Sequence, residues 1–124
     1  MAYLYNWTDS PWKGQAYLDF IMRNFYTNQP DGIIGNEDCG QMSAWYVMSA
    51  IGLYQVCPGN PVYTLGRPMV QKATLPMRKG NLEIIAHNNS AANKYVKEVK
   101  WNGKTLEKPF ISHSELTQGG KLEF

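Results

Sequence analysis

A short polar stretch between two glycines holds the residues of this chain that are best suited to chemistry. Asn36, Glu37 and Asp38 are consecutive, and they lie between Gly35 and Gly40, just ahead of an apolar segment. Glycine lets a backbone come close to a ligand, because it carries no side chain. A carboxylate in such a place could act as an acid or a base, or it could bind a cation. Asp38 is therefore a candidate catalytic residue.

A purely structural role for Asp38 is the alternative. Gln41 follows Asp38 by three residues, which is the spacing of a capping box at the start of a helix. A carboxylate there also meets the positive end of the helix dipole, and such a cap contributes only about 1 kcal/mol. Because a helix N-terminus favours the ionised form of a carboxylate, capping and catalysis are compatible. The spacing alone leaves both roles open.

Two helices are expected to position this stretch. The first covers residues 10–27, with Ser10 as N-cap and Pro11 at the first helical position. Its predicted buried face follows the i, i+3, i+4, i+7 spacing and comprises Leu18, Ile21, Met22 and Phe25. The second helix should run from about Cys39 to Ile51, and Gly52 suits a left-handed C-cap. Residues 28–32 (NQPDG) indicate a turn between the two helices.

The second half of the chain has the pattern of a sheet. VYTLG, VQKATL, LEIIAH, YVKEVKW, KTLE, PFIS and KLEF are short, rich in β-branched residues and partly alternating. Asn102-Gly103 favours a type I′ hairpin turn, in which both central residues need positive φ. We therefore expect an α+β fold: a helical hairpin over residues 1–56, then an antiparallel, sandwich-like β unit of six or seven strands over residues 57–124.

The overall composition narrows the possible partners. Hydrophobic residues make up 44% of the chain and charged residues 18%, which is typical of a globular protein. The net charge is +2, and the chain contains no dense run of Lys and Arg of the kind that would indicate a nucleic-acid partner. No apolar run is long enough to span a bilayer, and no signal peptide is visible. Cys39 and Cys57 match no zinc or redox spacing; a disulfide between them is the weaker alternative, and we expect two free, partly buried thiols.

A longer motif around the polar stretch has a family resemblance. PDGIIGNEDCGQMSAWYVMSAIGLYQVCPGNPVYTLGRP resembles the C-terminal part of glycoside hydrolase family 92, whose members are exo-acting α-1,2-mannosidases and related α-mannosidases. AYLYNW resembles the tyrosine-rich segment that precedes this motif. NNSAANKYVKEVKWNGKTLEKPFISHSEL resembles the closing β-sandwich of the family. The resemblance covers essentially the whole chain, which we expect to be a fragment of a longer enzyme.

The resemblance implies a fold and a reaction. Residues 1–56 would be the last helices of an (α/α)6 barrel with the base-bearing loop, and residues 57–124 would be the C-terminal β unit. Family members hydrolyse α-mannosides with inversion and depend on calcium. Inversion needs a general acid and a general base. The base carries over onto Asp38, whereas a second carboxylate found in many members aligns with Asn36. This departure leaves Asn36 able to orient a water but unable to share a proton.

The remaining expectations concern ligands and partners. Glu37 and Trp7 are expected to contact the substrate, a mannose-containing glycan. The general acid and the main calcium ligands would lie outside this chain, which would be inactive alone. The partner would be the remainder of the parent enzyme, and an exposed apolar face on the helices would favour self-association. The parent would be secreted or periplasmic. The alternative hypothesis is a carbohydrate-binding or structural β-sandwich module without catalysis, in which Asp38 is only a helix cap.

Overall fold

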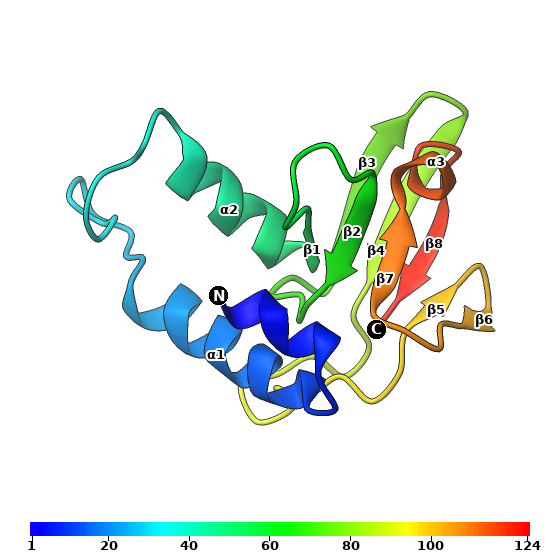
Figure 1. The fold of residues 1–124 in the computed structure, drawn as a ribbon, viewed down its shortest axis with the longest axis horizontal. Coiled ribbons are helices and arrows are strands. Elements are labelled where there is room, and N and C mark those ends of the chain that lie inside the picture. Colours follow the sequence, from blue (N-terminus) through cyan, green and yellow to red (C-terminus); the bar gives the residue numbers. More distant parts are fainter.

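The computed structural model describes residues 1–124, which form a helical layer beside a β unit (Figure 1). The helical layer contains a 3-10 helix, η1 (Ala2–Trp7), and two α-helices, α1 (Pro11–Asn24) and α2 (Gln41–Ala50). A loop over residues 25–40 joins α1 to α2 at the end of the molecule farthest from the strands (Figure 1). The order of helices before strands confirms the predicted mixed class.

Helix α1 begins at Pro11 with Ser10 as its N-cap, as the sequence predicts, although the Ser10 side chain makes no capping hydrogen bond. Of the predicted apolar face, Leu18 and Met22 are buried, whereas Phe25 is 39% exposed. The helix η1 was not predicted. It packs on α1, where Ala2, Tyr3 and Leu18 form a small buried cluster. Helix α2 starts two residues later than expected, and Gly52 follows it with φ 89° as predicted.

Eight short strands and a third helix, α3 (His113–Leu116), complete the chain. The strands are β1 (Leu53–Tyr54), β2 (Val62–Leu65), β3 (Lys72–Met77), β4 (Gly80–Ile85), β5 (Lys100–Trp101), β6 (Lys104–Thr105), β7 (Phe110–Ser112) and β8 (Gly120–Glu123). They form a three-stranded sheet in the order β1-β2-β7 and a five-stranded sheet in the order β3-β4-β8-β5-β6. The Asn102-Gly103 turn joins β5 to β6 with φ 49° and 84°, which confirms the predicted hairpin.

The expectation of a wholly antiparallel unit is wrong at one position. Strand β8 pairs with β4 in parallel, from Leu82 opposite Gly120 to Ile85 opposite Glu123. The reason is that α3 carries the chain from β7, in the first sheet, across to the second sheet, where β8 enters between β4 and β5. Strand patterns in a sequence show which residues are extended but not the direction in which a strand enters a sheet.

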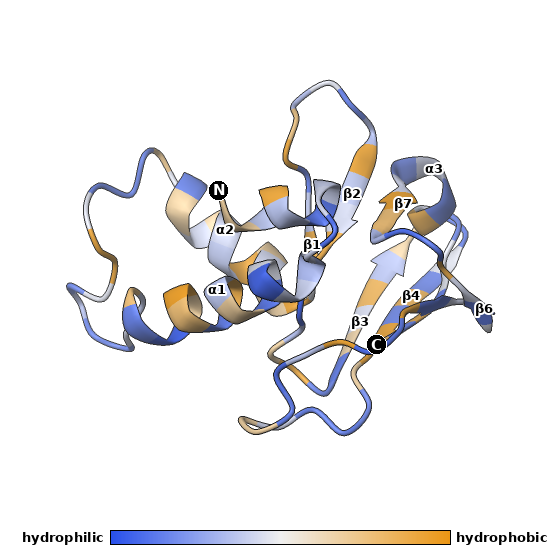
Figure 2. Ribbon diagram, turned by 60° about the horizontal axis from the view of Figure 1, so that its bottom comes forward, coloured by the Kyte–Doolittle hydropathy of each residue, from blue (hydrophilic) through white to orange (hydrophobic).

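The apolar core lies between the two sheets. Its buried members come from the first sheet, the second sheet and α3, and they are Leu53, Leu65, Leu82, Ile84, Ile111, Leu116 and Leu122. Two sheets that share one apolar interior form a sandwich-like unit. Figure 2 shows apolar residues recurring along the strands and along α1.

Hydrogen bonds and an ion pair join the helical layer to the β unit. Within the helical layer, the hydroxyl of Tyr3 in η1 donates to Ser49 Oγ in α2 at 2.8 Å, and both side chains are buried. Between this layer and the β unit, the side-chain amide of Asn6 donates to the carbonyl of Leu65 at 2.7 Å. Arg67, which follows β2 and is 4% exposed, forms an ion pair with Asp19 of α1. The backbone N–H of Val96 donates to Gln15 Oε1 at 2.9 Å. The loop between β4 and β5 is thereby fastened to α1.

The helical layer leaves several large hydrophobic side chains exposed. Large exposed hydrophobic side chains include Leu4, Trp7, Trp12, Tyr17, Phe20 and Phe25. This confirms the expected exposure of apolar surface on the helices. No helix combines the length and the hydropathy that a membrane span requires.

Candidate active-site loop

The loop over residues 25–40 is built around a tight turn. A bridge pairs Tyr26 with Ile33, and the N–H of Thr27 donates to the carbonyl of Gly32 at 2.8 Å. A Cβ atom at Gly32 would lie 1.9 Å from the carbonyl oxygen of Thr27, so only glycine fits there. The predicted turn at residues 28–32 is therefore present, and it brings the polar stretch back toward the start of α2.

Three consecutive residues before α2 adopt the left-handed conformation. Asp38, Cys39 and Gly40 have φ values of 54°, 58° and 94°. Non-glycine residues seldom adopt this conformation, and runs of them at functional sites are held by their surroundings. Because Gly40 is the N-cap, Gln41 is the first helical residue rather than the third, and the capping box predicted for Asp38 and Gln41 does not form. The spacing rule failed because it assumes a normal backbone before the helix.

Glu37 takes the place at the helix end that the sequence assigned to Asp38. Its Oε1 accepts a hydrogen bond from the backbone N–H of Ser43 at 2.9 Å. Its backbone carbonyl accepts from the N–H of Met42 at 3.2 Å, and the carbonyl of Asp38 accepts from Gln41 at 3.2 Å. Glu37, expected to contact a substrate, therefore already has a partner within the chain.

Asp38 and Asn36 are both exposed, on either side of the half-buried Glu37. The Asp38 carboxylate takes part in none of the ion pairs of the structure. A free carboxylate and an amide two residues apart can accept and orient the hydrogens of a water molecule. This arrangement suits general-base chemistry, in which a carboxylate takes a proton from an attacking water.

The start of the loop packs on aromatic rings of α2. Tyr26 stacks on Trp45 with ring centroids 5.8 Å apart and lies 4.8 Å from the ring of Tyr46. Burial, followed by the nearby charge of Glu37, raises the pKa of the Tyr26 phenol, which therefore stays neutral. Trp45 also packs edge-on against Tyr3, with ring centroids 6.5 Å apart. Sequence reasoning missed Tyr26 because one aromatic residue ahead of a turn carries no distinguishing signal.

Trp7 does not lie with the polar loop. It ends η1, packs on Phe110 of β7 at a centroid distance of 4.8 Å and is 57% exposed. Figure 1 shows η1 and β7 well away from the loop between α1 and α2. Within this chain, Trp7 and Asp38 therefore do not belong to one site.

The chain does not hold a complete metal site by itself. No group of three or more His, Cys, Asp or Glu side chains is placed to bind a metal ion. Calcium takes six to eight oxygen ligands, and the polar stretch before α2 offers only the side chains of Asn36, Glu37 and Asp38, with Glu37 already bonded to α2. The residues present therefore do not fit a calcium ion without further ligands. Cys39 and Cys57 are free as expected, although both are exposed rather than partly buried.

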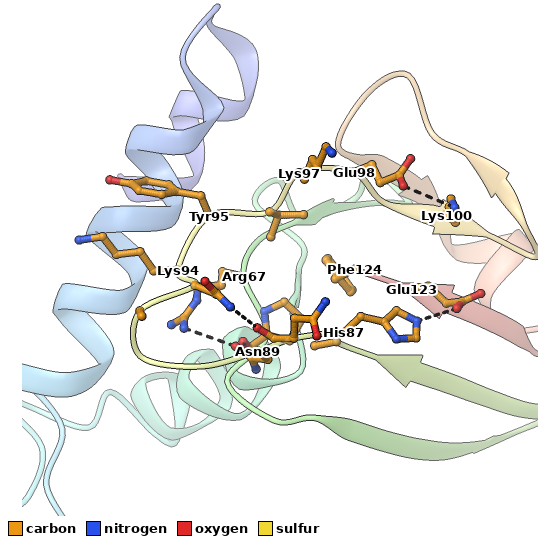
Figure 3. Close-up of a pocket in the computed structure, with 16 residues that line it drawn as sticks. Arg67, His87, Asn89, Lys94, Tyr95, Lys97, Glu98, Lys100, Glu123 and Phe124 are labelled. Carbon is orange, nitrogen blue, oxygen red and sulfur yellow. Dashed lines mark hydrogen bonds and ion pairs between the residues drawn. The ribbon is translucent and has the colours of Figure 1, made fainter.

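A cavity of about 480 Å³ lies on the other side of the molecule, along the loop between β4 and β5 (Figure 3). His87 Nε2 is 2.8 Å from Glu123 Oε2, and this hydrogen bond lowers the pKa of Glu123. Lys100 pairs with Glu98 at 3.4 Å. These two pairs lie within the cavity, whereas Lys94 and Lys97 of its lining take part in no ion pair. The sequence analysis predicted no functional residue in this cavity.

Comparisons with known proteins agree on one family. The family described as the glycosyl hydrolase family 92 catalytic domain matches residues 1–124. The structure of the family 92 alpha-mannosidase from Bacteroides thetaiotaomicron is 44% identical, with a TM-score of 0.92, over 99% of this chain and 17% of that chain. A family 92 inverting mannosidase from Bacteroides thetaiotaomicron VPI-5482 is 41% identical, with a TM-score of 0.90, over 98% of this chain and 17% of its own.

A fungal relative is more distant. An uncharacterized secreted glycosidase from Arthroderma benhamiae is 23% identical over 98% of this chain and 16% of its own length. The chain thus spans about a sixth of the length of the relatives that it matches. The match over every residue, together with the two close structural relatives, decides the family: this chain belongs to glycosyl hydrolase family 92.

Proposed function

We propose that this chain is the C-terminal part of an exo-acting, inverting, calcium-dependent α-mannosidase, and that Asp38 is its general base. The observation that carries the proposal is the combination of a family match over the whole chain with one free, exposed carboxylate on a fixed turn. Both mannosidases of Bacteroides thetaiotaomicron share this part of the fold at more than 40% identity.

In the proposed reaction, the Asp38 carboxylate takes a proton from a water molecule on the ring face opposite the leaving group. The oxygen of that water forms the new bond to the anomeric carbon while the glycosidic bond breaks. A general acid outside this chain gives its proton to the leaving oxygen. Asn36 accepts a hydrogen bond from the same water through its amide oxygen and so helps to orient it. The separation of acid from base explains why the isolated chain would be inactive.

Calcium would complete the site with ligands from the remainder of the enzyme, since this chain lacks a sufficient set. Removing calcium with a chelator should abolish mannose release by the whole enzyme, and added calcium should restore it. The isolated chain should show no calcium binding by titration calorimetry. Tight binding by the isolated chain would contradict the assignment of the main ligands to the rest of the enzyme.

The base assignment is tested by mannose release from an α-linked mannobiose, using the enzyme that contains this chain. Asp38→Asn should reduce kcat by about a thousandfold, because one proton transfer loses its base. Asp31→Asn, which changes another exposed carboxylate of the same loop, is the matched control and should leave kcat unchanged. Proton NMR of the first product formed should show the β-anomer of mannose. Retained activity in Asp38→Asn, or the α-anomer as first product, would contradict the proposal.

The location and partners of the parent are part of the same proposal. We propose a secreted or periplasmic enzyme that acts on mannose-containing glycans, supported by the fungal relative described as secreted. The exposed apolar face of the helical layer would pack against the remainder of the enzyme. The isolated chain would then self-associate through that face, which sedimentation at rising concentration would detect.

A further inference from the structure

The turn that carries Asp38 is held by neighbours rather than by its own conformational preference. A left-handed non-glycine residue costs roughly 1–2 kcal/mol, and Asp38 and Cys39 both adopt this conformation. Residues 34–36 and 38–41 are exposed, so burial contributes little to fixing the turn. The contacts that hold Asp38 in place are the hydrogen bonds between the turn and the first turn of α2.

Glu37 supplies two of those hydrogen bonds. The side chain reaches Ser43 N at 2.9 Å, and the backbone carbonyl accepts from Met42 N at 3.2 Å. These two bonds span the residues from 38 to 41, so they close the turn across its open side. The Glu37 carboxylate also lies at the positive end of the α2 dipole, which favours a negative charge there.

We infer that Glu37 is a positioning residue, which holds the turn so that the carboxylate of Asp38 stays free to act on water. In this division of roles, Glu37 satisfies the N–H groups at the helix end that a capping Asp38 would otherwise bind. A base that also capped the helix would have one oxygen occupied and its orientation fixed toward the helix. The inference rests on the proposed function of Asp38, and it replaces the expectation that Glu37 contacts the sugar.

Three substitutions in the whole enzyme separate positioning from sugar contact. Glu37→Gln removes the charge but keeps an oxygen at the same distance, which can still accept from Ser43 N. Glu37→Asp keeps the charge but is one methylene shorter and cannot reach Ser43 N without moving the turn. We expect Glu37→Gln to keep kcat within about threefold of the unchanged enzyme. Glu37→Asp and Glu37→Ala should lower kcat at least about tenfold, with KM for α-linked mannobiose within about twofold.

The opposite pattern would overturn the inference. If Glu37 bound the sugar through its charge, Glu37→Asp would retain more activity than Glu37→Gln, and KM would rise in both. Equal kcat in all three variants would also reject positioning. Should Glu37→Ala fail to fold, as judged by its melting curve, the Gln and Asp variants decide the matter. Asp38→Asn in the same series separates the role of Asp38 as base from the role of Glu37 as positioning residue. If Asp38→Asn stays active, the base assignment is wrong. If Asp38→Asn is inactive while all three Glu37 variants stay fully active, only the role of Glu37 is wrong.

Discussion

The ion pair between Asp19 and Arg67 gives a sharp test of how the helical layer is attached. Arg67 is 4% exposed, and besides Asp19 it has a carbonyl partner, Ser90 O, at 2.8 Å and Asn89 Oδ1 at 3.4 Å. Its Nε has no partner at all. Burial lowers the pKa of Arg67 and the charge of Asp19 opposes that shift, so the guanidinium stays protonated. The change to make is Asp19→Ala.

Removing one member of a buried pair leaves an uncompensated charge and typically costs about 3–5 kcal/mol. Because Ser90 O still accepts from Arg67 in the variant, we expect the lower end, a loss of about 3 kcal/mol in the free energy of unfolding. With an unfolding entropy of about 2.1 cal/mol/K per residue over 124 residues, this corresponds to a fall in Tm of about 12 °C.

The measurement is urea and thermal unfolding of this chain, followed by circular dichroism. Arg23→Ala is the matched control, since Arg23 pairs with the same Asp19 at 2.9 Å but its side chain is 44% exposed. An exposed pair of this kind should contribute less than about 0.5 kcal/mol. The double variant Asp19→Leu with Arg67→Met removes both charges and should regain at least half of the loss. Equal effects of Asp19→Ala and Arg23→Ala would refute the reasoning.

Three further changes test other parts of the fold. Tyr3→Phe should lower the free energy of unfolding by about 1–3 kcal/mol, because Ser49 loses its buried hydrogen-bond partner. In a double-mutant cycle measured by urea unfolding, Tyr3→Phe combined with Ser49→Ala should lower it by less than the sum of the two single changes. Gly52→Ala should lower Tm, since φ there is 89° and a Cβ would lie 2.8 Å from Pro68; an unchanged Tm would contradict this. Hydrogen bonds from Ser112 lower the pKa of Glu115 in the folded chain below its ordinary value of 4.5. The stability that these bonds give to the folded state is therefore complete above pH 4.5, and it is lost as the pH falls through the lower pKa of the folded chain. Ser112→Ala should therefore destabilise the chain by about 1 kcal/mol at pH 7 and by less at pH 3; a pH-independent difference would refute the linkage.

The sequence predicted the elements better than their pairing. Pro11, Gly52 and Asn102-Gly103 were informative because each imposes a backbone conformation by its own chemistry. The parallel pairing of β8 depends on contacts between residues almost forty positions apart, which no local pattern records. The helix α3 was missed although Ser112 and Glu115 have capping-box spacing, since four residues are too few for a periodic apolar face.

The site was predictable as a stretch but not in its internal arrangement. Residue types and flanking glycines single out residues 35–40 as the candidate site, and the assignment of a catalytic role to Asp38 stays a prediction. The side chain of Glu37, and not that of Asp38 as predicted, accepts a hydrogen bond from the start of α2. The backbone causes this difference, because positive φ at Asp38 and Cys39 moves the helix start to Gln41. Trp7 shares an aromatic type with residues near the loop but lies elsewhere, beside Phe110. Spacing rules could detect neither effect.

The central place of β8 also constrains the order of events during synthesis. Strand β5 pairs only with β6 and β8, so the β5-β6 hairpin has no link to the β3-β4 hairpin until residues 120–123 have been made. On the ribosome, the edges of β4 and β5 that later pair with β8 would remain unpaired until β8 is made. Unpaired edges favour association with other chains, and long-range pairing closes slowly. Nascent chains of this protein should therefore need protection until β8 is released and completes the sheet.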